Sequence, residues 1–224
     1  KVYDFFINFY SDKKTEMKIY FQRKENKELN YIKKMIGRDT WFIDIGSNIG
    51  LYSLNVASLN DKTNKINILS IEPHPIMLTR LKENLDMLIS RNIYVKKRFS
   101  IVNKAIGVNK KKGYLDVSGN HANSRLTLDK KKKTIKVKIV DINDLIKKYK
   151  IKKIGCIKID TEGSEIQILK SLFKKKKNNK ILLPLFMIIE HNRDKNYYHL
   201  HNFIISRGYN VVFKSNSNYV YKKS

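Results

Sequence analysis

The pattern of apolar and polar positions alternates along the chain between two periods. Short, nearly continuous apolar runs such as 41–45 are typical of buried strands, whereas apolar residues recur every three or four positions in segments such as 49–57. Strands that alternate with helices predict an α/β fold with a mostly parallel, doubly wound sheet covered on both faces. The predicted strands are residues 41–45, 66–71, 154–159 and 181–189, and the predicted helices are residues 49–57, 76–89, 164–173 and 197–207.

Weaker patterns lie between these segments and at the end of the chain. Residues 99–106 and 134–142 are expected to be extended, and residues 144–148 to form a short helix. In the tail, apolar runs at 209–213 and 219–221 flank a Ser-Asn-Ser-Asn turn, which predicts a C-terminal antiparallel hairpin at the sheet edge.

No linker rich in Gly, Ser or Pro divides the chain. We therefore expect one domain over residues 41–224, with residues 1–40 forming an N-terminal extension or a lid packed on it. The chain begins at Lys1 rather than Met, and we interpret it as a domain excised from a longer multidomain protein.

The chain is strongly basic, with 47 Lys and Arg against 20 Asp and Glu and a net charge of +27. Such a charge suggests nucleic acid or an anionic surface as a partner. However, only 8 of the basic residues are Arg, whose planar guanidinium suits phosphate better than Lys does. The lysine runs at 110–112, 130–133 and 174–177 have no interleaved aromatic residues, so we interpret them as solvated loops.

Cysteine usage and hydropathy restrict the environment. A single cysteine, Cys156, excludes an intramolecular disulfide and favours a reducing compartment, which we take to be the cytoplasm. No apolar run is long enough for a membrane span.

The first candidate site lies where the strand at 41–45 turns into a helix. Gly46 and Gly50 allow a tight turn and close backbone approach to a ligand, and Ser47 and Asn48 lie between them. The pattern lacks the third glycine of a dinucleotide-binding turn. Asp44, two positions before the turn, suits a ligand with an amino group, which it could face directly or through a water molecule.

The second candidate site lies at the end of the next strand. Glu72 is placed to accept the two ribose hydroxyls of an adenosine, although a helix N-cap before Pro73 is an alternative use of this residue. Asp44, Gly46, Gly50 and Glu72 together describe a site for S-adenosylmethionine.

In four segments the chain resembles the FkbM family of S-adenosylmethionine-dependent methyltransferases. The similarity lies in FIDIGSNIGLYSLNVA (42–57), ILSIEPHPIMLTRLKENL (68–85), IVNKAIG (101–107) and IKIDTEGSEIQILKS (157–171). The resemblance implies a seven-stranded, Rossmann-like class I methyltransferase sheet and O-methylation of a sugar or related hydroxyl. It also implies that the loop with Asn103 and Ala105 lies against the adenine.

Acids and a histidine follow two further strands on the same edge of the predicted sheet. Asp160 and Glu162 follow one strand, and Glu190 and His191 follow another. Methyl transfer to a hydroxyl requires in-line alignment and a group that takes the proton, so these four residues are the catalytic candidates. Alternatively, Asp160, Glu190 and His191 bind a divalent cation that lowers the pKa of the hydroxyl.

A polar loop at 119–125 offers His121, Asn123 and Arg125 as candidates for binding the acceptor, a carbohydrate or glycoconjugate; a solvent loop is the alternative interpretation. Two other functions stay open. One is RNA 2′-O-methylation, favoured by the basic charge. The other is a non-catalytic basic binding module that has kept the cofactor fold.

Overall fold

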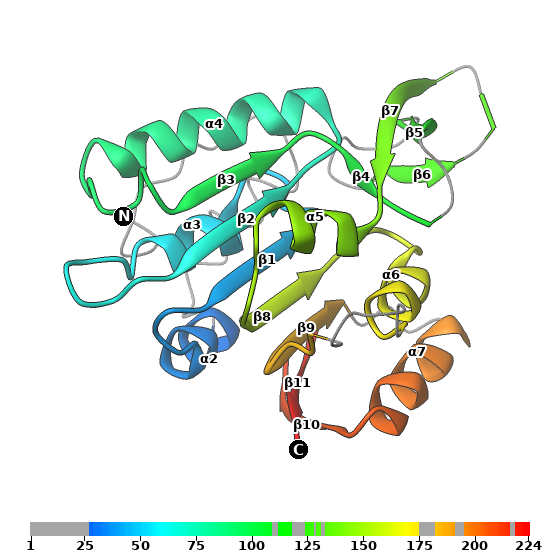
Figure 1. Cartoon of the computed structure of the whole chain (residues 1–224). Helices are drawn as coiled ribbons and strands as arrows, with labels where there is room; N and C mark the ends of the chain where they lie inside the picture. Colours follow the sequence, from blue (N-terminus) through cyan, green and yellow to red (C-terminus); the bar gives the residue numbers. More distant parts are fainter. Residues whose placement is uncertain are drawn as a thin grey trace.

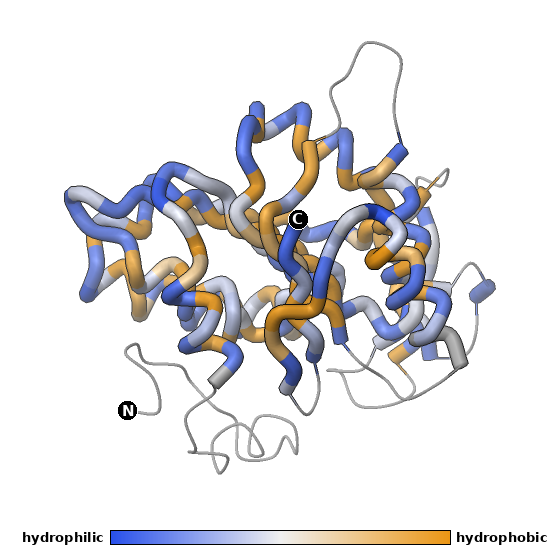
Figure 2. Tube along the Cα trace, turned by 90° about the horizontal axis from the view of Figure 1, so that it is seen from below, coloured by the Kyte–Doolittle hydropathy of each residue, from blue (hydrophilic) through white to orange (hydrophobic). Residues whose placement is uncertain are grey.

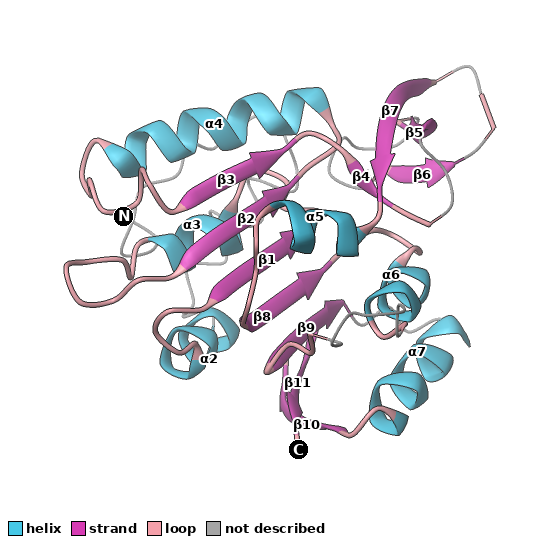
Figure 3. Ribbon diagram, in the orientation of Figure 1, coloured by secondary structure: helices cyan, strands magenta, loops and turns pink. Residues whose placement is uncertain are grey.

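A seven-stranded sheet forms the centre of the molecule (Figure 3). The computed structural model describes residues 27–108, 112–117, 124–127, 129–130, 133–174, 182–190, 195–215 and 218–224. The order in the sheet is β10-β11-β9-β8-β1-β2-β3, and the five strands from β9 to β3 are parallel. The strands are β1 (Trp41–Ile45), β2 (Asn67–Ile71), β3 (Phe99–Val102), β8 (Ile154–Ile159), β9 (Phe186–Glu190), β10 (Tyr209–Lys214) and β11 (Asn218–Lys223).

The C-terminal hairpin predicted from the sequence is confirmed. β10 and β11 pair antiparallel, and β11 continues antiparallel onto β9. The strand predicted at 181–189 is shorter than expected, since β9 begins only at Phe186. Pro184 lies just before it, and a proline has no N–H with which to continue the hydrogen-bonded ladder.

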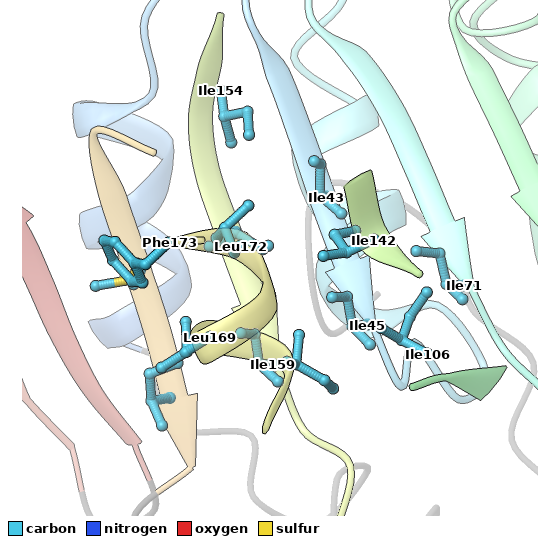
Figure 4. Close-up of a cluster of buried hydrophobic side chains, with 14 of the residues drawn as sticks. Ile43, Ile45, Ile71, Ile106, Ile142, Ile154, Ile159, Leu169, Leu172 and Phe173 are labelled. Carbon is cyan, nitrogen blue, oxygen red and sulfur yellow. The ribbon is translucent and has the colours of Figure 1, made fainter. Parts of the chain in front are cut away.

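Helices cover both faces of the sheet because successive side chains of each strand point to opposite sides (Figure 1). In β1, Ile43 and Ile45 join a buried cluster with three helices of one face, whereas Phe42 joins the cluster of the other face. Figure 4 shows the first cluster, in which Ile142 and Leu169 approach the isoleucines of the strands. The helices of this face are α5 (Ile142–Lys148), α6 (Glu165–Leu172) and α7 (Lys195–Ser206), and those of the other are α2 (Lys27–Met35), α3 (Leu51–Ala57) and α4 (Pro75–Ile89).

A second, four-stranded sheet stands beyond the end of the main sheet (Figure 1). It explains why the segment predicted to be extended over 99–106 is interrupted: β3 ends at Val102, and the chain then enters another sheet. The order is β4-β7-β5-β6, with β4 (Ala105–Ile106), β7 (Thr134–Val140), β5 (Lys112–Asp116) and β6 (Arg125–Thr127). The expected strand at 134–142 ends at Val140, because Asp141 caps the N-terminus of α5.

The segment before β1 packs on the fold where it is described. Leu29 and Ile32 of α2 are buried in the cluster under α3 and α4. Residues 1–26 of the predicted extension lie outside the described residues, so a lid over 1–40 stays a prediction. Hydrophobic stretches run through the interior, and most loops at the rim are hydrophilic (Figure 2).

Cys156 is buried in β8 with a free thiol, in agreement with a small core side chain. Among the described residues, no helix has both the length and the apolar character needed to cross a membrane.

Candidate functional site

A pocket opens at the carboxyl ends of the parallel strands, the edge at which open α/β sheets bind ligands. Its empty volume is about 680 Å³, a figure that includes the open solvent at its mouth. The second sheet contributes one wall through Leu115 and Leu126. The remaining lining comes from Ile45, Gly46, Asn48, Ile71, Glu72, Pro73, Met77, Lys104, Ala105, Ile106, Ser124, Asp160, Thr161, Glu162 and Ser164.

The turn between β1 and α3 has the backbone conformations that its glycines permit. Gly46 has φ +79° and Gly50 has φ +93°. A Cβ at Gly46 would collide with the backbone carbonyl of Asp160, and one at Gly50 with the side chain of Leu81. Gly46 therefore permits the close approach of β1 to the loop after β8, in addition to lining the pocket.

Two backbone amides anchor this turn to the neighbouring strand. The N–H groups of Gly46 and Ser47 both donate to the carbonyl of Ile71, at 3.0 and 3.1 Å. Asn48, with φ +51°, then directs its own N–H to the carboxylate of Glu72 at 2.8 Å. The first and second candidate sites of the sequence are thus in direct contact.

Glu72 lines the pocket and is only 6% exposed. Oε2 accepts from the N–H of Asn48, and Oε1 accepts from the N–H of His74 at 2.8 Å. Burial raises the pKa of Glu72 to about 7, although both backbone hydrogen bonds lower it. The alternative use of Glu72 as the helix cap is wrong, because His74 is the N-cap of α4 and its Nδ1 accepts from Ile76.

The loop after β3 is tied to the loop that carries Glu72. The side-chain amide of Asn103 donates to the carbonyl oxygens of Glu72 and Pro73 at 2.9 and 3.2 Å. Ala105, with its neighbour Lys104, lines the pocket. In the structure Asn103 holds the pocket wall, and its predicted contact with an adenine stays a prediction.

Asp44 lies behind the turn and is not among the pocket-lining residues. Its Oδ2 accepts from the N–H and the hydroxyl of Ser53 at 3.1 and 2.6 Å, near the start of α3, whose N-cap residue Gly50 has no side chain to cap the helix. Burial raises the pKa of Asp44, and the nearby Lys158 opposes this effect. A contact between Asp44 and the amino group of a ligand therefore remains a prediction that the geometry does not itself provide.

Three carboxylates meet at the same edge of the sheet. Asp160, Glu162 and Glu190 each place an oxygen within 4.8 Å of the others. Burial and the negative charge of Asp160 raise the pKa of Glu190 to about 8, and the same two causes raise the pKa of Glu162. Because of this crowding, the carboxyl group of Glu190 is still largely protonated at neutral pH.

The predicted catalytic set is only partly covered by the described residues. His191 follows Glu190 directly but lies outside them, and so do the acceptor candidates His121 and Asn123. Arg125 is exposed on β6, close enough to Glu162 for its positive charge to offset part of the rise in the pKa of that carboxyl. For a metal, the described part of the chain brings together Asp160, Glu162 and Glu190, and nothing beyond their closeness points to an ion.

Two residues of this edge were not identified from the sequence. Lys158 is buried in β8, and its Nζ lies 2.7 Å from Oδ2 of Asp160 and 4.6 Å from the ring centroid of Tyr52. Burial alone would lower the pKa of Lys158, but Asp160 and Asp44 outweigh it and raise the pKa. The signal was present in the sequence as a lysine inside an apolar strand, two positions before an acid and thus on its face.

Glu165 is the second such residue, at the start of α6. Its carboxylate accepts from the N–H of Thr161 at 2.9 Å, from the hydroxyl of Thr161 and from the N–H of Gly163. This arrangement fixes the loop that carries Glu162, whose φ of +55° is rare for a residue other than glycine.

Comparison with known proteins agrees with this architecture. The profile of the family described as the methyltransferase FkbM domain matches residues 44–211. A curated relative, the hexuronic acid methyltransferase AglP of Haloferax volcanii, is 23% identical over 147 residues, which are 66% of this chain and 54% of the relative.

Two solved structures share the fold. The methyltransferase FkbM from Methylobacillus flagellatus has a TM-score of 0.55 at 16% identity. The match covers 92% of this chain and 53% of the Methylobacillus protein. A precorrin-6y C5,15-methyltransferase from Geobacter metallireducens has a TM-score of 0.54 at 12% identity. The match covers 100% of this chain and 99% of the Geobacter protein. The chain spans about half the length of both the curated relative and the Methylobacillus protein.

Proposed function

The chain belongs to the FkbM methyltransferase family, and from this premise we propose that it is an S-adenosylmethionine-dependent O-methyltransferase acting on a hydroxyl of a sugar or glycan. The family implies the cofactor. The relative from Haloferax volcanii, named for a hexuronic acid, supports a sugar acceptor. We also interpret the main sheet as the doubly wound, Rossmann-like type of class I methyltransferases, with residues 41–224 as the catalytic domain.

The chemistry of the pocket lining fits the cofactor. Glu72 is a buried carboxylate whose two oxygens retain acceptor capacity for ribose hydroxyls, beside apolar walls such as Ile71 and Met77. When bound, S-adenosylmethionine supplies an electrophilic methyl group on a sulfonium sulfur. The residues that would hold it are Asp44, Gly46, Ser47, Asn48, Gly50, Glu72, Asn103 and Ala105.

The acids at the sheet edge would remove the proton of the acceptor hydroxyl. A general base is most effective when its pKa lies near the working pH, and the pKa of Glu190 is raised to about 8. Asp160 is paired with Lys158, which leaves Glu190 as the acid less strongly tied to a cation. We assign the base to Glu190, with Asp160, Glu162 and His191 as the other catalytic candidates.

One observation carries this proposal: Asp160 and Glu162 line the same pocket as the buried Glu72, and Glu190 lies within reach of both. A carboxylate that can bind the cofactor and a carboxylate that can accept the hydroxyl proton thus lie beside the same cavity. Methyl transfer to a hydroxyl requires this arrangement.

The test is transfer of a labelled methyl group to sugars by the wild-type chain and by Glu190→Gln. We expect this variant to bind S-adenosylhomocysteine as the wild type does and to lose about 10² to 10⁴ in rate. Asp86→Asn, an exposed carboxylate on α4, is the matched control and should keep full activity. Full activity of Glu190→Gln would contradict the assignment of the base, and a parallel series with chelator tests the divalent metal.

A further inference from the structure

The second sheet has two faces of opposite character. Leu115, Val137 and Ile139 are buried, and Leu115 lines the pocket. Because side chains alternate along a strand, the residues between them point to the other face, where Lys136 and Lys138 are exposed. The wall that the second sheet gives to the pocket is therefore a single layer of β-sheet, with an apolar inner face and a basic outer face.

Two lysines of the outer surface lie directly opposite one another. In the antiparallel pair β5 and β7, Lys112 faces Lys138, and Tyr114 faces Lys136. Like charges opposite each other across a ladder are destabilising. Lys112 belongs to the lysine run at 110–112, for which we expected a solvated loop, but the structure places it in β5.

Arg125 connects this basic surface to the mouth of the pocket. It begins β6, opposite Asp116 of β5, and its positive charge partly offsets the rise in the pKa of Glu162 that burial and Asp160 cause. Ser124, its neighbour, lines the pocket. A chain that leaves the pocket beside Ser124 therefore meets Arg125 first and can continue over Lys136, Lys112 and Lys138.

We propose that the outer face of the second sheet, formed by Lys112, Lys136, Lys138 and Arg125, binds an acidic glycan whose reacting sugar lies in the pocket. This inference rests on the proposed function and specifies its substrate class. The cross-strand lysines favour an anionic occupant, since it would remove their mutual repulsion.

The acids of the pocket edge determine where the charges of this glycan lie. Once Glu190 is ionised, as a general base must be, Asp160, Glu162 and Glu190 would repel a carboxylate at the reacting position, so the sugar there presents a neutral hydroxyl. The carboxylates belong to neighbouring sugars, outside the pocket and over the lysines. Nucleic acid fits less well, because Tyr114 is the one aromatic residue of this face in the described part of the chain and stacking surfaces are few.

The test measures binding of a fluorescent polygalacturonate oligomer, a neutral maltooligosaccharide and a single-stranded RNA to the full chain at low salt. The face variant is Lys112→Gln with Lys136→Gln and Lys138→Gln. The control is Lys62→Gln with Lys65→Gln and Lys96→Gln, three exposed lysines. Lys62 and Lys65 lie in the loop between α3 and β2, at the other end of the molecule (Figure 1).

We expect the face variant to weaken polygalacturonate binding by about tenfold or more at low salt, and the control by less than about twofold. The melting temperature of the face variant should equal or exceed that of the wild type, because like charges are removed. Its methyl transfer to a small methyl glycoside should be unchanged.

Three results would overturn the proposal: no binding of polygalacturonate by the wild type, equal loss in both triple variants, or tighter binding of RNA that the face variant abolishes. Absence of methyl transfer to every glycan, with the binding difference intact, would instead refute the proposed activity, so the two failures are distinguishable.

Discussion

The variant Glu72→Gln tests two effects of this buried carboxylate separately. One is the cost of its burial to the stability of the fold, and the other is its contribution to cofactor binding. Glu72 is 6% exposed, and burial raises its pKa from 4.5 to about 7. Because the folded pKa lies above the unfolded one, the protonated form favours folding. Its stabilising contribution is fully present below pH 4.5 and is lost as the pH rises through about 7. Glutamine stays neutral throughout and removes this dependence.

The magnitude follows from the size of the shift. One pKa unit corresponds to about 1.4 kcal/mol, so between pH 5 and pH 8 the free energy of unfolding of the wild type should fall by about 2 to 3 kcal/mol relative to the variant. The glutamine amide can accept from only one of the N–H groups of Asn48 and His74, which costs about 1 to 3 kcal/mol. That loss is similar at every pH, so the pH dependence of the difference is the informative quantity.

The assay is urea unfolding of both proteins at pH 5, 6, 7 and 8, with Asp86→Asn as an exposed control that should follow the wild type. Parallel stability curves for the wild type and Glu72→Gln would refute the reasoning. Calorimetry with S-adenosylhomocysteine gives the second readout. Wild-type affinity should increase as the pH rises through about 7, because ribose hydroxyls donate to the ionised carboxylate, and Glu72→Gln should lose most of the affinity.

Three further changes test other parts of the site. Gly46→Ala should lower the free energy of unfolding by about 3 kcal/mol or prevent folding, since its Cβ collides with the carbonyl of Asp160. Gly163→Ala is the control, because Gly163 has φ +118° but nothing lies within 4 Å of its added Cβ. It should lower the free energy of unfolding by only about 1 kcal/mol in the same urea experiment. Lys158→Met should cost about 1 to 3 kcal/mol, because Asp160, whose side chain is 34% exposed, loses its hydrogen bond to a buried cation, and unchanged stability would contradict this. The rate of methyl transfer should rise with pH through about 8 as Glu190 ionises; a flat profile would exclude Glu190 as the base.

Periodicity was sufficient to predict the central elements. The strand predicted at 41–45 is β1, and the helix predicted at 76–89 is α4 (Pro75–Ile89) to within one residue. Both are buried against neighbours on a regular sheet, so their side-chain pattern reflects their environment directly. The helix expected from Ile49 begins at Leu51 instead, because Gly50 takes a left-handed conformation that a hydrophobic pattern does not reveal.

The second sheet and the details of the site depend on contacts between distant segments. β5 is five residues long and pairs with β7 across the 17 residues 117–133, so no local pattern indicated the pairing. For Asp44, the period of the strand indicates a face but not whether that face opens to the pocket, and the structure directs the carboxylate to Ser53. Glu165 acts through backbone groups that its sequence neighbours do not identify.

The central claim is methyl transfer from S-adenosylmethionine to a sugar oxygen, and the position of the transferred methyl tests it most directly. The wild-type chain is incubated with the labelled cofactor and a panel of neutral glycosides, acidic glycans and RNA, and the products are analysed by NMR. We predict the label on a hydroxyl oxygen of a glycan, with much less product from Glu72→Gln than from the wild type. Label on RNA ribose, or on no acceptor despite cofactor binding, would contradict the account.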